Sequence, residues 1–225
     1  MALFVLTLPA VLVLFVFKYL PMGGLVLAFK NYKPLLGIFG SPWNGFENFM
    51  FFFRSQLIWN VTRNTLLYNL SFIVLTPIIA VTFAIMMYEI ARPVFIKIYQ
   101  TILFLPFFMS WVVVSIMLFA LLNSSTGLLN ELLAALFGIQ PIRWYTQPNL
   151  WPPIIIFMYL WKTTGYATVI YFAGLMGIDP SLYEVAAIDG ATRMQRIFRI
   201  TIPLLSPLIV IMAILAIGRI FFADF

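Results

Sequence analysis

The polar and charged residues of this chain gather mainly in one stretch, residues 179–203, between two long apolar runs. Within it, Ser181 and Glu184 have the S-x-x-E spacing of a capping box, in which a hydroxyl and a carboxylate satisfy backbone N–H groups at a helix start. Asp179 and Pro180 offer a competing start, because proline at the first helical position lacks only an N–H that would be unpaired anyway. The spacing predicts a short helix in a loop at the membrane surface.

The second half of this stretch predicts a break followed by a basic helix. Gly190 gives the backbone the conformational freedom that a break requires. Ala186 and Ala187, just before it, give the first helix a small-residue surface that a groove of another protein could approach closely. Three basic residues then recur every third position, which places them along one side of a helix: Arg193, Arg196 and Arg199.

The chain lacks the residue types that most catalytic sites use. It has no Cys and no His, which removes thiolate chemistry, the commonest general base and the commonest metal ligand. It has no G-x-x-x-x-G-K-S/T phosphate loop and no H-E-x-x-H motif, so ATP would have to be hydrolysed by a partner and metalloprotease chemistry is excluded. We therefore expect no enzyme activity, no metal site and no cofactor bound by this chain.

Composition places the chain in the membrane. Of its 225 residues, 64% are hydrophobic and 9% are charged, which fits no soluble core. The net charge of +6 suits contact with anionic lipid headgroups. The sequence has no clustered basic tract of the kind that indicates nucleic-acid binding. The fold class is an all-α integral membrane protein, a polytopic helical bundle.

The apolar runs predict five transmembrane helices, at about residues 2–20, 64–88, 98–122, 150–177 and 202–222. The first run has no basic start and no small-residue cleavage site, so we expect a retained span rather than a signal peptide. Five spans put the loops 89–97 and 178–202 on one face. Each face carries five basic residues, but these two loops are about half as long as those opposite, so basic density places them in the cytoplasm.

The 179–203 stretch resembles the EAA motif of the permease subunits of bacterial ATP-binding-cassette importers, which reads E-A-A, three residues, G, nine residues, I-x-L-P. Five positions of this sequence fall on the pattern in register: Glu184, Ala186, Gly190, Ile200 and Pro203. Val185 replaces an alanine and Ile202 the leucine, and both changes keep the apolar character. The resemblance implies the type I importer permease fold, one permease domain over residues 1–225 and a sixth span that we expect to follow the fifth.

In that family the loop forms a cytoplasmic coupling helix that sits in a cleft of the ATPase. The resemblance implies this role for Tyr183, Glu184, Ala186, Ala187, Asp189, Gly190, Ala191, Arg193 and Pro203. It also implies that ATP and magnesium are bound by the partner ATPase, whose closure would move the coupling helix and the spans behind it.

Four further segments resemble the carbohydrate-uptake branch and its permeases for oligosaccharides: residues 17–32, 40–49, 160–166 and 218–225. The partners implied are a second homologous permease in a heterodimer, a dimer of ATP-binding subunits, an extracytoplasmic solute-binding protein, membrane lipid and a carbohydrate. The location implied is the bacterial cytoplasmic (inner) membrane. The alternatives are a secondary transporter or channel not driven by ATP, which inverted repeats would support, and a membrane scaffold.

Polar groups inside the predicted spans are the candidates for lining the substrate pathway: Asn64, Asn69, Tyr159, Trp161, Lys162 and Tyr166. An unpaired charge at the depth of Lys162 would cost a few kcal/mol, so its ammonium should face a cavity, a partner or a substrate. It is either a counter-ion for an acid on the partner permease or a contact to substrate. The others could bond to or stack on sugar rings, or serve helix–helix packing.

Overall fold

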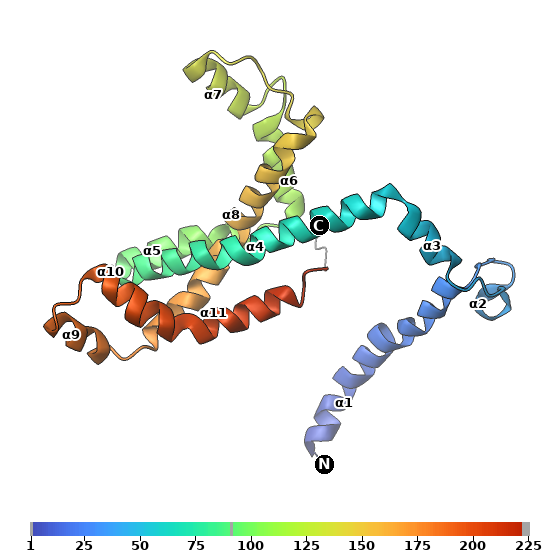
Figure 1. Ribbon diagram of the computed structural model, residues 1–225, viewed down its shortest axis with the longest axis horizontal. Helices are drawn as coiled ribbons and strands as arrows, with labels where there is room; N and C mark the ends of the chain where they lie inside the picture. The colour runs from blue at the N-terminus through green and yellow to red at the C-terminus, as the bar shows by residue number, and fades with distance from the viewer. Residues whose placement is uncertain (1, 91, 222–225) are drawn as a thin grey trace. The chain divides into compact units, whose positions relative to one another are not determined.

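The structure is a computed structural model that describes residues 2–90 and 92–221, with side chains from residue 6 onward (Figure 1). These residues are nearly all helical, and the described part contains no named strand, only one isolated bridge between Lys30 and Trp43. The chain divides into two compact units, one ending at Arg63 and the other beginning at Asn64. Each unit is described by itself below.

The first unit opens with a helical segment longer than the predicted span. Helix α1 (Ala2–Leu14) continues through a π turn, η1 (Phe15–Tyr19), and a 3-10 segment, η2 (Leu20–Phe29). The helical segment therefore continues past the predicted end near residue 20, and the bounds of the span within it stay a prediction. Pro21 lies in the first turn of η2, where its missing N–H is not needed, so it does not stop the helix.

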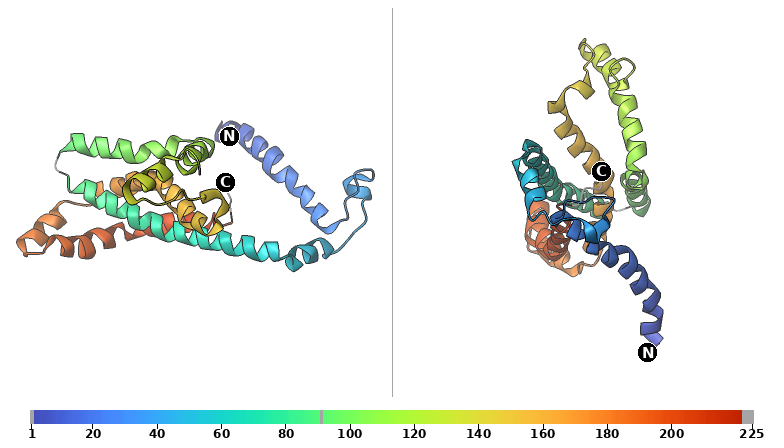
Figure 2. Two further views of the ribbon diagram at one scale, coloured as in Figure 1. Left: turned by 90° about the horizontal axis from the view of Figure 1, so that it is seen from above. Right: turned by 90° about the vertical axis from the view of Figure 1, so that its right-hand side faces the viewer.

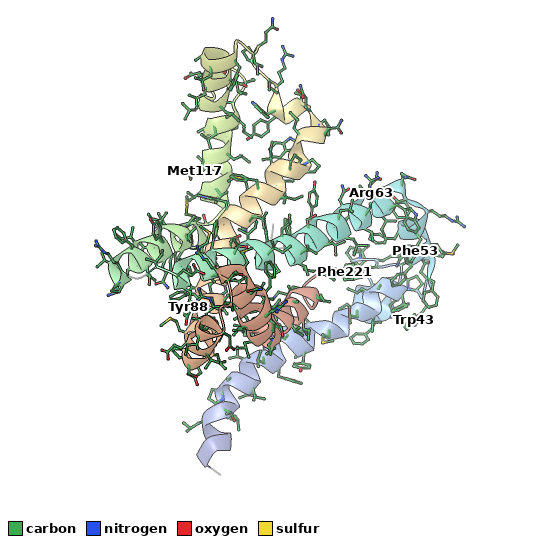
Figure 3. All side chains as sticks on the ribbon, turned by 60° about the vertical axis from the view of Figure 1, so that its left-hand side comes forward. Trp43, Phe53, Arg63, Tyr88, Met117 and Phe221 are labelled. Atoms are coloured by element: carbon green, nitrogen blue, oxygen red, sulfur yellow. The ribbon has the colours of Figure 1, made fainter. Side chains whose placement is uncertain are left out.

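A compact loop follows, with helices α2 (Gly37–Gly40) and α3 (Glu47–Arg54). The buried Lys30 ammonium donates to the carbonyls of Ile38 at 2.9 Å and Phe39 at 3.1 Å. Aromatic side chains such as Trp43 and Phe53 are exposed on this loop (Figure 3).

The second unit contains most of the remaining helices. They are α4 (Gln56–Tyr88, which begins before the unit boundary), α5 (Pro93–Phe104), η3 (Leu105–Phe108), α6 (Trp111–Leu122), α7 (Leu128–Phe137), η4 (Trp144–Thr146), η5 (Pro148–Leu150), α8 (Trp151–Met176), α9 (Ser181–Ile188), α10 (Arg193–Arg196), η6 (Ile197–Thr201) and α11 (Ile202–Ile217). Helix α8 runs across α4, α5 and α11 (Figures 1 and 2). It is the central element of this unit.

The core of the second unit lies where α4, α8 and α11 meet. Ala80 and Ala84 of α4 have no exposed surface and pack with Tyr171 and Leu175 of α8 and Leu205 of α11. Small residues on α4 let the neighbouring helices approach closely, as is usual between helices in a membrane.

The described residues contain three helical segments long and apolar enough to cross a membrane: Leu6–Phe29, Gln56–Tyr88 and Arg193–Ile217. A fourth results if the bent pair α5–η3 and α6 is one span. Helix α8 has 26 residues, which is enough to cross, but its central polar residues make it less apolar than these three. The structure supports a polytopic helical membrane protein, while the count of five spans and a sixth beyond them stay predictions.

The predicted third span, 98–122, is not one continuous helix. It breaks between η3 and α6, and the two parts are bent by 97°. Pro106 has no N–H to donate to the carbonyl four residues earlier, so the α-helix ends at Phe104 and the 3-10 segment η3 follows. Ser110 then starts α6 by accepting a hydrogen bond from the Val113 N–H at 3.3 Å.

The loop between α6 and α8 is organised by one buried amide. Asn130 on α7 donates to the Ile142 carbonyl at 3.0 Å, and its side-chain oxygen accepts from the Ile142 N–H and from Trp144 Nε1. Gly138 ends α7 with a φ of +65°. Burial near Trp151 raises the pKa of the Tyr145 hydroxyl above its usual value. The loop predicted over 123–149 is thus an ordered segment that contains α7, η4 and η5 and is held together by Asn130.

Candidate functional site

Helix α9 begins at the competing start and not at the predicted capping box. The Ser181 side chain caps no backbone N–H; instead, Asp179 Oδ1 accepts from the Ser181 N–H at 2.9 Å. This hydrogen bond lowers the pKa of the Asp179 carboxyl below its usual value. The cap is therefore complete at neutral pH and is lost as the pH falls through the lowered pKa.

The predicted break is at Gly190, whose φ of +75° lies in the left-handed region. The Ala191 N–H donates back to the Ala186 carbonyl at 2.9 Å, which closes the end of α9. A true capping box follows at Thr192, whose N–H donates to Gln195 Oε1 at 2.7 Å while its hydroxyl accepts from the Gln195 N–H. The T-x-x-Q spacing in the sequence was the signal for this start.

The predicted basic helix after the break is present, and it continues into the last apolar helix, so the predicted boundary at 202 between loop and span does not coincide with a break in the helix. Because Thr192 caps a helix, α10 begins at Arg193 and continues through the π turn η6 into α11. Of the predicted coupling residues, those from Tyr183 to Ala191 lie on α9 and the turn after it, and Arg193 is the first residue of α10. Pro203 lies apart from them, in the first turn of α11.

Three contacts tie α9 and α10 to the helices behind them. Arg193 forms an ion pair with Glu89, in the turn after α4. The Tyr183 hydroxyl lies 3.1 Å from the Thr201 hydroxyl in the π turn, and its ring lies 5.9 Å from that of Tyr88. A displacement of α9 would therefore be felt at the end of α4 and at the start of the last helix.

The opposite side of α9 is open and apolar. Leu182, Val185 and Ile188 are exposed at intervals of three residues, which places them along one side of the helix. Glu184 and Ala187 are exposed beside them, and Ala186 is half-buried. This short helix can insert into a groove of another protein.

The candidate pathway residues separate into two groups. Tyr159, Lys162 and Tyr166 share one face of α8, because they are three and four residues apart. Trp161 is half-buried on another side of the same helix. On α4, Asn64 is exposed, and the Asn69 amide donates to the Thr65 carbonyl of its own helix at 2.9 Å.

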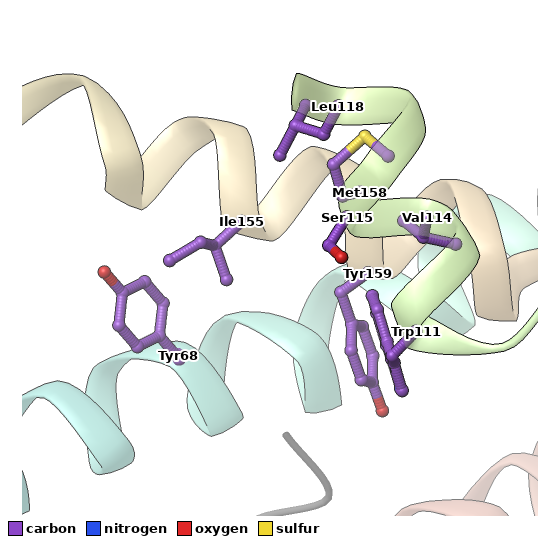
Figure 4. A pocket seen from close by; sticks show the side chains of 8 residues that line it. All are labelled: Tyr68, Trp111, Val114, Ser115, Leu118, Ile155, Met158 and Tyr159. Atoms are coloured by element: carbon purple, nitrogen blue, oxygen red, sulfur yellow. The ribbon is translucent and has the colours of Figure 1, made fainter. Parts of the chain in front are cut away.

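A cavity of about 340 Å³ opens beside this face of α8 (Figure 4). Its walls come from α4, α6 and α8 and are almost wholly apolar: Tyr68, Trp111, Val114, Ser115, Leu118, Ile155, Met158 and Tyr159. The Tyr159 ring stacks on Phe72 at 3.7 Å between centroids and lies 6.4 Å from Trp111. Flat aromatic rings of this kind can stack on the apolar faces of sugars.

Sequence reasoning missed Tyr68, Phe72 and Trp111, which complete the aromatic wall around Tyr159. The four-residue spacing of Tyr68 and Phe72 on one helix was an available signal. Their approach to α8 depends on the tertiary fold, and no local pattern indicates it.

Lys162 lies at the edge of this wall and is 9% exposed. Its Nζ donates to the Phe107 carbonyl at 3.0 Å and lies 5.5 Å from the centre of the Phe107 ring and 5.3 Å from that of Trp111. Among the described residues, the ion pair that the structure forms is between Arg193 and Glu89. Lys162 is thus held by a backbone carbonyl and two rings.

Gly165, three residues further along α8, makes the crossing with α5 possible. A Cβ at this position would overlap the Leu103 carbonyl oxygen. The next residue, Tyr166, stacks on Phe107 at 4.6 Å between ring centroids. The same face of α8 therefore holds the end of α5 and the start of α6.

Residues 78–223 match the family described as the binding-protein-dependent transport system inner membrane component. The chain belongs to this family. As in other members, ATP is hydrolysed by a separate subunit, and the predictions of a non-enzymatic permease subunit of an ATP-driven importer and of an inner-membrane location are confirmed.

Among curated family members, the chain is similar to the polygalacturonan/rhamnogalacturonan transport system permease protein YteP of Bacillus subtilis (strain 168). The two are 37% identical over 217 residues, which cover 96% of this chain and 67% of YteP. The chain thus spans about two thirds of the length of this relative.

Two solved structures of bacterial alginate importers have the same fold. One is a bacterial ABC transporter involved in the import of the acidic polysaccharide alginate, with a TM-score of 0.88 and 34% identity over 97% of this chain and 73% of that one. The other is a bacterial alginate ABC transporter in complex with an alginate pentasaccharide-bound periplasmic protein, with a TM-score of 0.87 and 34% identity over 97% of this chain and 72% of that one.

Proposed function

We propose that this permease forms part of the translocation pathway for an oligosaccharide and couples it to a cytoplasmic ATPase through α9. The observation that carries the proposal is the exposed apolar side of α9, tied on its other side to the ends of the spans. The similarity to permeases named for polygalacturonan and alginate supports a polysaccharide-derived substrate.

The proposed assembly contains a second homologous permease in a heterodimer, a dimer of ATP-binding subunits with ATP and magnesium, and an extracytoplasmic solute-binding protein in contact with a bilayer. The periplasmic protein bound to the related alginate importer supports the last partner. In this assembly, closure of the ATPases pushes α9. The ion pair of Arg193 with Glu89 and the Tyr183–Thr201 contact transmit this displacement to α4 and α11.

The substrate would travel along the face of α8 that carries Tyr159 and Tyr166, next to the aromatic cavity. Sugar rings present an apolar face to aromatic rings and hydroxyls to polar groups, so a wall of this composition can hold a sugar without fixing one position. Asn64, Asn69 and Trp161 lie outside this cavity lining, and we assign them to the pathway only through contacts that the assembled complex would add.

The coupling role is tested by reversing a charge on α9. Glu184→Lys changes an exposed side chain, so the chain should fold and its permease pair should form. Oligosaccharide-stimulated ATP hydrolysis and uptake should fall about tenfold or more, because a lysine now meets the ATPase cleft where a carboxylate belongs. The measurements are co-purification of the ATPase and uptake in proteoliposomes with and without ATP.

The matched control is Lys97→Glu, which reverses an exposed charge in α5, near the turn that holds Glu89. It should leave uptake near the unaltered rate. Full uptake by Glu184→Lys in an intact complex would contradict the coupling role, and uptake that continues without ATP would favour a secondary transporter or channel.

A further inference from the structure

The break between η3 and α6 exposes backbone groups that a continuous helix would pair. The Met109 N–H donates to the Pro106 carbonyl at 3.2 Å, and Ser110 caps the next helix. The Phe107 carbonyl is paired from far along the chain, by the Lys162 ammonium. In a membrane such pairing is needed, because the hydrocarbon core offers no water to unpaired backbone groups.

Lys162 contacts both arms of the bend. Phe107 belongs to η3, which ends the first arm, and Trp111 is the first residue of α6, which forms the second. The ammonium bonds to the carbonyl of the first and lies over the rings of both. A single cation thus connects the two sides of a 97° break.

We propose that Lys162 is a positioning residue that fixes the angle between α5 and α6. By holding Trp111, it sets this ring against Tyr159 in the wall of the cavity. Removal of the Lys162 side chain would affect a substrate because the aromatic wall of the cavity moves, and not because a charge is lost. The effect on transport rests on the proposed function, whereas the effect on the bend does not.

Spin labels attached to introduced cysteines can measure the bend directly. The chain has no Cys of its own, so no native residue has to be replaced first. Labels at Ile98→Cys on α5 and Ile116→Cys on α6, both exposed positions, report the distance across the break in the assembled complex with cysteine-free partners. Lys162→Met should broaden or shift the distance distribution by pulsed electron paramagnetic resonance. Lys162→Arg should keep it narrow, because a guanidinium also donates to a carbonyl and stacks on rings.

The matched control is Thr163→Val. The Thr163 hydroxyl donates to the Tyr159 carbonyl of its own helix at 2.8 Å, so its loss should leave the distribution unchanged. An unchanged distribution in Lys162→Met would overturn the proposal. If Lys162→Met does not assemble, Trp111→Leu removes one of the contacts across the break. It should broaden the distribution, and a narrow one would likewise overturn the proposal.

Transport separates positioning from substrate contact. Lys162→Met should lower the uptake rate about tenfold for a uronate oligosaccharide and a neutral one alike, because an unpaired buried carbonyl disfavours the native bend for both. Lys162→Arg should restore most of the rate. A selective loss for the uronate, carried by a higher KM, would make Lys162 a substrate contact and overturn the positioning role.

Discussion

Single residues decide how the coupling segment is shaped. Gly190 alone adopts a left-handed backbone between α9 and α10, and Thr192 alone starts the following helix. Both lie within the EAA-like spacing, which explains why a pattern of so few letters can specify a three-dimensional element. Asp179 completes it by capping α9.

Gly190→Ala should weaken coupling through the backbone. A Cβ there would meet nothing within 4 Å, so the change tests φ and not crowding. A left-handed conformation costs an alanine about 1–2 kcal/mol, a factor of about 5–30 in the population of the native turn. Hydrogen exchange of the Asp189–Thr192 amides should quicken, and ATP-driven uptake should fall.

Gly177→Ala is the control, because Gly177 has an ordinary negative φ of −85° and a Cβ there would lie 3.5 Å from its nearest neighbour. In Gly177→Ala, the rate of amide hydrogen exchange at Asp189–Thr192 and the rate of ATP-driven uptake should equal those of the unaltered chain. Equal behaviour of the two variants would show that the sign of φ at Gly190 has no role.

At the scale of elements, two prolines show what the sequence could and could not predict. Pro77 lies inside α4, which continues to Tyr88, whereas Pro106 ends the helical run of α5. The local chemistry of the two prolines is the same. The difference at Pro106 is the break at Met109–Ser110 that follows it, where Lys162, 55 residues further along the chain, donates to the Phe107 carbonyl.

The candidate site divides in the same way. The coupling helix could be predicted because its residues are contiguous and their spacing has a fixed meaning. The aromatic wall could not, since Tyr68, Trp111 and Tyr159 come from three helices that only packing brings together. The basic helix after the break could be predicted from the spacing of its arginines, whereas its unbroken continuation through the π turn into α11 could not.

The α5–α8 crossing gives a prediction at this scale. Gly165→Ala would place a methyl group against the Leu103 carbonyl, a backbone atom that cannot rotate away. The helices must separate, which should destabilise the chain by about 1–3 kcal/mol. Thermal unfolding of the purified complex in detergent should show a lower Tm.

Gly174→Ala is a matched comparison on the same helix. Its methyl would meet the ends of Leu208 and Leu205 at 2.7 and 3.0 Å, and these flexible side chains can adjust. Its Tm should fall less than that of Gly165→Ala. A larger fall for Gly174→Ala would contradict the importance of the α5–α8 approach.

At the scale of the whole molecule, the chain buries little of its apolar surface by itself. The most apolar part of Leu6–Phe29 is entirely exposed within the chain, and that of Gln56–Tyr88 is 28% buried. We expect lipid and partner subunits to cover the rest, since an aqueous surface of this composition would aggregate. The chain is built to be completed by an assembly in a bilayer.

The bent pair decides the topology. Its limbs are about 26 Å for α5 with η3 and about 18 Å for α6. The second limb is bent by 97° from the direction of the first, so their far ends are about 30 Å apart. This matches the hydrocarbon core of about 30 Å. We therefore expect the pair to cross the membrane as one broken span.

Single cysteines test this directly. Val94→Cys and Ser124→Cys lie at exposed positions on either side of the pair. A membrane-impermeant maleimide should label Val94→Cys only from the cytoplasm and Ser124→Cys only from outside. Labelling of both from one side would make the pair a re-entrant loop and overturn the predicted orientation.

The Lys162–Phe107 bond also bears on how the protein is made. A lysine at the centre of an inserting helix costs about 2.5–3.5 kcal/mol, and α8 is not among the described helices that are apolar enough to count as a span by themselves. The ribosome delivers α5, η3 and α6 first, so the residue whose carbonyl accepts this cation has already been synthesised when α8 emerges. Because of this order, the Phe107 carbonyl is available to accept a hydrogen bond from Lys162 when α8, which inserts poorly by itself, enters the bilayer.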